Sequence, residues 1–196
     1  MSAEHEEQVQ VAKADKTQLG FWLYLMTDAM LFASLFATYM ILRHNVNGGP
    51  GTSELFSLTF VLAETMILLT SSYTVGLANI ALRHKQWREF VVYFAITILL
   101  GLAFLGLEIG EFAKLVHEGF TWQTSAFLSA FFTLVGTHGL HILVGIVWAG
   151  VLGWAFYRQG ANRDLERKFG LFALFWHFLD IVWIFIFTIV YVLGVI

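Results

Sequence analysis

The chain has 196 residues, of which 58% are hydrophobic and 13% are charged, and its net charge is −3. Charged residues usually make up about a quarter of a soluble domain, so this composition excludes an ordinary water-soluble protein and indicates a membrane protein. The absence of cysteine excludes disulfide bonds, thiol catalysis and thiolate metal sites.

The first twenty residues are mainly polar and precede any long apolar run. They contain four acidic residues and two lysines, and they lack the apolar core and small-residue cleavage site of a signal peptide. We therefore expect residues 1–20 to form a soluble, mobile tail on a single transmembrane domain of residues 21–196.

Five long apolar runs follow the tail. A helix needs about 20 mostly apolar residues to cross the hydrocarbon core of a bilayer. A closed β-barrel would need short segments of alternating polarity, whereas these runs are apolar on all faces. The sequence therefore predicts an all-α, polytopic bundle of five transmembrane helices at residues 21–42, 55–82, 90–112, 126–157 and 169–193.

Basic residues are distributed unequally between the two sides of this arrangement. Nine of the eleven lysines and arginines lie in the tail or in the loops at residues 83–89 and 158–168, which share one side; the other two are Arg43 and Lys114. Because cytoplasmic segments carry the excess of basic residues, we expect the N-terminus inside and the C-terminus outside. We interpret the basic loops as topology signals and not as a specific site for anionic lipids.

Two glycine-containing motifs predict local structure. Residues 47–51 read NGGPG and contain the only proline of the chain, which predicts a sharp turn between the first two helices. In the third run, Gly106 and Gly110 form a small-xxx-small pattern that predicts the close approach of a neighbouring helix. The sequence has no internal repeat, which argues against an alternating-access transporter.

Seven acidic or histidine residues lie inside the predicted spans, away from their ends. A charged group is costly in hydrocarbon, so each should face another helix, a cavity or a partner subunit. They comprise an inner tier of Asp28, His177 and Asp180, an outer tier of Glu64, Glu108 and His138, and His141 on the same helix as His138.

His138 and His141 lie one helical turn apart in the segment GTHGLHILVG, residues 136–145. Two such imidazoles can share a metal ion or haem, but no thiolate is available and the nearest carboxylates lie on other helices. We therefore favour buried, hydrogen-bonded histidines or a pair of histidine and carboxylate over a metal site. We expect Glu108 to pair with His138 or His141.

Asp28 lies in an otherwise apolar helix, where it is either a structural hydrogen-bonding group or part of a proton path. The sequence alone leaves both roles open. His177 and Asp180 lie three residues apart on one helix face, so a contact between them is geometrically allowed. Asp180 is accordingly expected to pair with His177 or with a neighbouring chain.

Four segments resemble subunit III of the haem-copper terminal oxidases. They read GFWLYLMTDAMLFASLFATY, GLEIGEF, SAFFTLVGTHGLHILVG and FWHFLDIVWIFIFTIVYVLG, and the resemblance covers all five runs. The mitochondrial form of that family has seven spans and a glutamate in the matching helix. Five runs and Asp28 make this chain similar to the subunit III of bacterial cytochrome bo-type ubiquinol oxidases.

This resemblance implies a non-catalytic subunit of a proton-pumping quinol oxidase, with no cofactor in this chain and with haems and copper in subunit I. Subunit I would be its direct partner, alongside subunits II and IV, and no nucleic acid would be bound. Phospholipids would occupy a V-shaped cleft between helices 1–2 and helices 3–5. The bacterial inner membrane would hold the chain with its N-terminus cytoplasmic and its C-terminus periplasmic.

The same resemblance implies roles for the polar residues. Glu108 matches the intramembrane glutamate of the third helix, His138 and His141 match the histidines of HGLH, and His177 and Asp180 match the pair in WHFxD. These roles are structural or linked to protons, and none is catalytic. The alternatives are subunit III of a menaquinol or cytochrome c oxidase, a stand-alone ion or proton transporter, and a haem- or copper-binding enzyme.

Overall fold

Helices account for nearly all of the chain in the computed structural model, which describes residues 2–48, 55, 57–160 and 162–195. Those residues contain no strand. Five helical segments are long and apolar enough to cross a membrane, as predicted. The elements are α1 (Ser2–Leu42), α3 (Leu58–Arg83), α4 (Trp87–His117), α5 (Ala126–Gln159), α6 (Arg163–Ile186), the π-helix η1 (Phe187–Val192) and α7 (Leu193–Val195).

Several helices extend beyond the apolar runs, because polar residues at their ends also favour helix. The N-terminal tail continues α1 as far back as Ser2, in a segment rich in good helix formers such as Glu, Gln, Ala and Lys. Asn162 caps α6, where its side chain accepts a hydrogen bond from the backbone N–H of Leu165 at 2.7 Å. The first apolar residue of a run is thus a poor guide to where its helix begins.

The predicted turn after α1 is partly visible. Asn47 and Gly48 adopt positive φ values of 52° and 76°, which suit a sharp change of direction. Residues 49–51 of the motif lie outside the described part of the chain. Just before the turn, the carbonyl of Asn45 accepts a hydrogen bond from the backbone N–H of Phe127, so this connection also contacts the start of α5.

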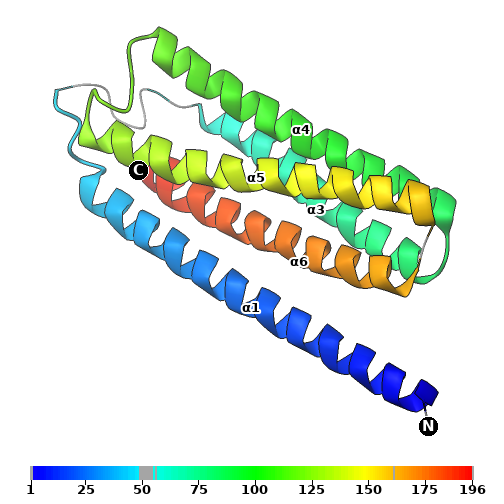
Figure 1. Cartoon of the computed structure of the whole chain (residues 1–196). Helices are drawn as coiled ribbons and strands as arrows, with labels where there is room; N and C mark the ends of the chain where they lie inside the picture. Colours follow the sequence, from blue (N-terminus) through cyan, green and yellow to red (C-terminus); the bar gives the residue numbers. More distant parts are fainter. Residues whose placement is uncertain (1, 49–54, 56, 161, 196) are drawn as a thin grey trace.

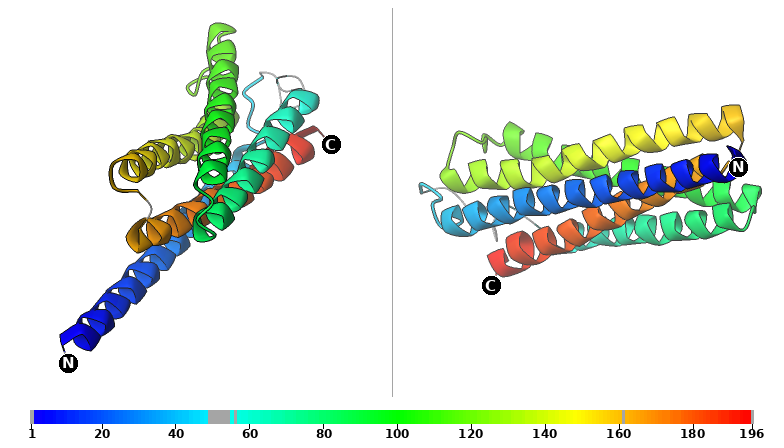
Figure 2. Two further views of the ribbon diagram at one scale, coloured as in Figure 1. Left: turned by 90° about the vertical axis from the view of Figure 1, so that its right-hand side faces the viewer. Right: turned by 60° about the horizontal axis from the view of Figure 1, so that its bottom comes forward.

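The helices pack around α6 (Figures 1 and 2). The second span, α3, packs along α4 and α6, whereas α1 packs against α5 and to a lesser extent against α6. The predicted V-shaped cleft would set α1 and α3 apart from the other three helices. α3 contacts both α4 and α6, so the two predicted groups of helices touch on this side. The cleft and its phospholipid stay predictions.

Trp176 of α6 lies at the centre of the core, between two glycines of neighbouring helices. A Cβ atom on Gly101 of α4 would come within 2.9 Å of its ring, and one on Gly145 of α5 would come within 2.8 Å. The indole N–H donates to Ser71 Oγ on α3 at 3.1 Å. One buried ring therefore contacts three helices and requires glycine at two of the contacts.

Gly106 and Gly110 of α4 do not make the helix contact that their spacing predicted. A Cβ atom on either would have no neighbour within 4 Å. Instead they line an open groove of about 500 Å³ between α3 and α4. Spacing alone thus identified two glycines that no described helix approaches closely, whereas Gly101 and Gly145 make the close contacts.

Replacing Gly145 by alanine is expected to lower the free energy of unfolding by about 1–3 kcal/mol, because the new methyl group overlaps the buried Trp176 ring. Gly150→Ala on the same helix meets no atom within 4 Å and should leave stability unchanged or slightly higher. Denaturant titration of the two variants in detergent measures this difference. Equal stabilities would contradict the packing described for Trp176.

Candidate functional site

Asp28 of α1 and His141 of α5 form an ion-pair contact within the bundle, with Nε2 of the histidine 3.2 Å from Oδ2 of the aspartate. Both side chains are largely buried. The two atoms are close but not aligned as a regular hydrogen bond. We expected Glu108 to be the carboxylate beside one of the two histidines, whereas the carboxylate that contacts His141 is Asp28.

The hydrogen bond at the other ring nitrogen limits the protons available to this pair. His141 Nδ1 lies 2.7 Å from the carbonyl oxygen of Thr137. A carbonyl only accepts hydrogen bonds, so Nδ1 carries a proton. One further proton, on either the imidazole or the carboxyl group, lets Nε2 and Asp28 approach without repulsion. In both arrangements the pair has no net charge, which suits its place between two helices.

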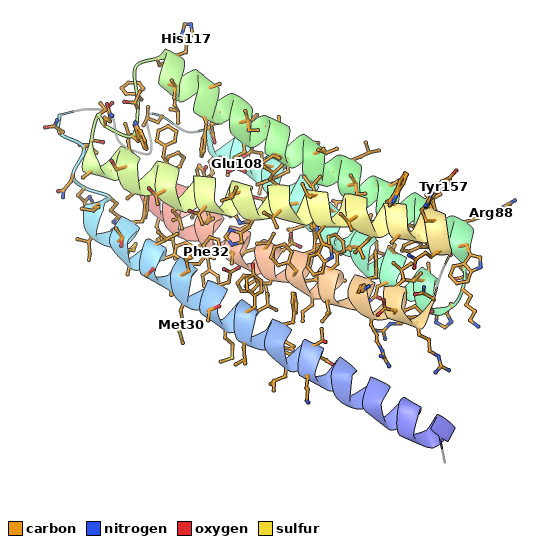
Figure 3. All side chains as sticks on the ribbon, viewed as in Figure 1. Met30, Phe32, Arg88, Glu108, His117 and Tyr157 are labelled. Carbon is orange, nitrogen blue, oxygen red and sulfur yellow. The ribbon has the colours of Figure 1, made fainter. Side chains whose placement is uncertain are left out.

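Phe32 and Thr137 fix the histidine from either side. The Phe32 ring lies 5.3 Å from the His141 ring, centroid to centroid. Figure 3 shows Phe32 on the side of α1 that faces the bundle, while Met30 points away from it. Tyr24, one turn before Asp28, also interacts with the Asp28 carboxyl group. The packing of Phe32 and the ion-pair contact of Asp28 with His141 together thus align α1 with α5.

His138 has a different environment although it is only one turn from His141. It is fully buried, and its ring stacks on Trp183 of α6 with centroids 5.2 Å apart. Phe104 and Phe32 contact the same ring. Neither ring nitrogen has a hydrogen-bond partner among the described residues. The predicted hydrogen bond between Glu108 and His138 is therefore not made directly.

Glu108 instead places its carboxyl group against the backbone of Gly139, the glycine between the two histidines. A Cβ atom at Gly139 would lie 2.6 Å from Oε1 of Glu108. Oε2 of Glu108 and Oε1 of Glu64 are both buried without hydrogen-bond partners in the described part of the chain. The two carboxyl groups interact electrostatically with each other and with Glu111. Glu64 and Glu108, which the sequence placed at a similar depth, thus lie near enough to interact electrostatically.

The inner tier does not assemble as one group. His177 bonds through Nδ1 to Ser72 Oγ on α3, at 2.6 Å. Asp180 is buried and interacts with the same Ser72 hydroxyl, although neither carboxyl oxygen makes a regular hydrogen bond among the residues described. The predicted contact between His177 and Asp180 is not among the ion pairs of that part of the chain. Asp28 belongs to the separate contact with His141.

Hydrogen bonds between hydroxyl and indole groups join α3 to α6, and the sequence interpretation missed them. Trp183 donates to Thr65 Oγ1 at 3.0 Å, as Trp176 does to Ser71. The two tryptophans are seven residues apart on α6, and the two hydroxyl residues are six apart on α3. This matched spacing was the available signal, but the sequence does not show which faces of the helices meet.

The chemistry that these side chains support is hydrogen bonding and the holding of protons. Among the described residues, no three His, Cys, Asp or Glu side chains gather in an arrangement that could hold a metal ion. The polar groups are distributed instead over three contacts, between α1 and α5, between α4 and α5, and between α3 and α6.

Comparison with known proteins gives matches along almost the whole chain. A family model described as cytochrome c oxidase subunit III matches residues 1–195. The chain is 50% identical to cytochrome bo(3) ubiquinol oxidase subunit 3 of Pseudomonas aeruginosa, over 91% of this chain and 85% of that relative. It is 49% identical to cytochrome c oxidase subunit 3 of Bacillus sp. strain PS3, over 91% and 86%. Quinol oxidase subunit 3 of Bacillus subtilis is 44% identical, over 90% and 86%.

Gly139→Ala is expected to destabilise the chain by about 1 kcal/mol, because the added methyl group displaces the Glu108 carboxyl group from its buried position. Gly136→Ala is the control, since its Cβ would lie at an ordinary 3.6 Å from Phe112. In a Glu108→Ala background, Gly139→Ala should lower the free energy of unfolding by much less. Thermal unfolding of the four variants measures this, and an undiminished cost in the double variant would contradict the contact.

Proposed function

The chain belongs to the cytochrome c oxidase subunit III family, and from this membership we propose that it is the non-catalytic subunit III of a proton-pumping terminal quinol oxidase. In this role it carries no haem or copper and binds directly to subunit I, which holds both. Subunits II and IV complete the complex. The match of residues 1–195 to the family model is the observation that carries the proposal.

The bacterial inner membrane is the proposed location of this multi-pass protein, with a cytoplasmic N-terminus and a periplasmic C-terminus. The excess of basic residues in the tail and in the loops after α3 and α5 supports this orientation. Phospholipid is a proposed ligand of the assembled complex. The described residues support a role in assembly, since their buried polar groups join helices to one another.

The contact between Asp28 and His141 suggests how the subunit supports proton uptake. The pair can hold one proton in addition to the proton on His141 Nδ1, and it then has no net charge. A group of this kind can hold a proton at moderate depth while it also docks α1. We propose that Asp28 tunes proton delivery to subunit I from the inner surface and does not itself carry the pumped protons.

A second candidate is subunit III of a cytochrome c or menaquinol oxidase. The 49% identity to a cytochrome c oxidase subunit 3 is the observation that favours it. Because another subunit binds the electron donor in either complex, the chains that co-purify distinguish the two candidates. A subunit with a cytochrome c-binding domain would identify the second.

Purification in a mild detergent tests the proposed function. The chain is expected to co-purify with a haem-containing oxidase, and its own separated fraction should show no Soret absorption. A Soret band stoichiometric with this chain would favour a haem enzyme. Movement of ions into vesicles that contain this chain alone would favour a stand-alone transporter.

Asp28→Asn is expected to leave the haem content of the oxidase intact and to lower turnover by about twofold or less, equivalent to roughly 0.4 kcal/mol in activation free energy. The amide keeps the size and hydrogen-bonding capacity of the side chain, but it cannot hold or release the shared proton. Oxygen consumption and proton uptake by the purified complex measure the effect.

Ser34→Ala is the matched control on α1, because the Ser34 hydroxyl is exposed and bonds only to the carbonyl of Leu31 in its own helix. It should not change turnover. Complete loss of pumping in Asp28→Asn, with normal assembly, would show instead that Asp28 is an obligatory proton carrier.

A further inference from the structure

His177 is an exposed polar side chain at the centre of a membrane span. It lies near the midpoint of the span Arg163–Val192, and its imidazole is exposed on the surface of α6. Its Nδ1 atom is bonded to Ser72 on α3. Within the described part of the chain, no group hydrogen-bonds the other ring nitrogen, Nε2.

This position limits what can cover the histidine. A neutral imidazole has one donor and one acceptor nitrogen, so the bond to Ser72 leaves one nitrogen to be satisfied. At the middle of the hydrocarbon layer there is no water, and acyl chains offer neither donors nor acceptors. A side chain or backbone group of another protein is therefore the partner that fits.

The residues around His177 have the composition of a protein interface. Ile181, Ile184 and Phe185 continue the same exposed face of α6, at four, seven and eight residues from the histidine. On the adjacent α3, Tyr73 follows Ser72 and is 68% exposed. We name these five residues, His177, Ile181, Ile184, Phe185 and Tyr73, the His177 face. Large apolar and aromatic side chains around one hydrogen-bonding group are typical of the centre of an interface.

The exposed face of α5 provides the contrast. Over the central part of the helix its outward residues Leu140, Val144, Val147 and Val151 recur at helical spacing and are aliphatic, and the exposed aromatic residues Trp154 and Tyr157 follow only near its C-terminal end. Hydrocarbon chains satisfy such a surface fully. Two helices of the same bundle thus present one face suited to lipid and one face that lipid leaves unsatisfied.

We propose that the His177 face is the surface on which a transmembrane helix of another oxidase subunit docks, and that this helix presents a hydrogen-bonding side chain to His177. This inference rests on the proposed function, because it takes the chain to be part of an oxidase complex. Beyond that function, the inference specifies which face of the bundle contacts the partner and what kind of side chain the partner provides.

Photocrosslinking in the intact oxidase tests the location of the interface. Benzoylphenylalanine replaces Ile181, which is 54% exposed, or Val147 of α5, which is 60% exposed and serves as the matched control. In irradiated membranes, benzoylphenylalanine at position 181 should crosslink to another subunit, whereas at position 147 it should give lipid adducts only. Subunit crosslinks from position 147 and none from position 181 would overturn the proposal, as would crosslinks from position 181 to lipid or quinone only.

Substitution of His177 tests the hydrogen bond. His177→Phe should increase the loss of this subunit from the complex in detergent by about tenfold, because it leaves a polar group of the partner unpaired. His177→Gln keeps a donor and an acceptor and should lose the subunit less readily, and Val147→Phe should have no effect. Equal retention of the His177→Phe and wild-type subunits would overturn the proposal.

Failure of the proposed function gives a different result. In that case the wild-type chain would not co-purify with an oxidase at all. Co-purification of the wild-type chain, with crosslinks confined to position 147, would overturn the docking surface alone.

Discussion

Asp28 and His141 lie inside the hydrocarbon layer, where no bulk water is available. Their side chains contact each other instead. The position of α1 depends on this pair, because α1 packs mainly against α5 and does not share the extensive contacts of α3 with α4 and α6. Apolar packing alone is a weak guide for helices in a membrane, since lipid chains are as apolar as leucine. A polar contact at one depth fixes both the rotation and the register of α1.

The same constraint explains the rest of the bundle. Indole N–H groups of α6 reach hydroxyl groups of α3, and the Glu108 carboxyl group occupies the space that Gly139 leaves open. His138 lies among aromatic rings, where its neighbours hold it by stacking. These side chains are used for helix association, which is consistent with an accessory subunit.

The number and type of the elements could be predicted from the sequence, because run length alone decides whether a helix crosses a bilayer. The partners of the polar residues could not, because they depend on how each helix is rotated about its axis. His138 and His141 lie three residues apart on one helix, so their side chains point in different directions. His141 contacts the Asp28 carboxylate, whereas the His138 nitrogens have no partner among the described residues. Likewise, the spacing of Gly106 and Gly110 predicted a close helix contact. The close contacts occur instead at Gly101 and Gly145, because the Trp176 ring packs against the backbone there. Depth depends only on position along each helix, and Glu64 and Glu108, which were placed at a similar depth, do interact electrostatically.

A double-mutant cycle on Asp28 and His141 tests the central claim most directly. Stability of the assembled oxidase would be measured for the wild type, for Asp28→Asn, for His141→Gln and for the double variant. If the pair docks α1, the two single effects will not add, and the coupling free energy will lie in the range of roughly 0.5–3 kcal/mol seen for residues in contact. Additive effects would show that the two side chains act independently, and this would contradict the account.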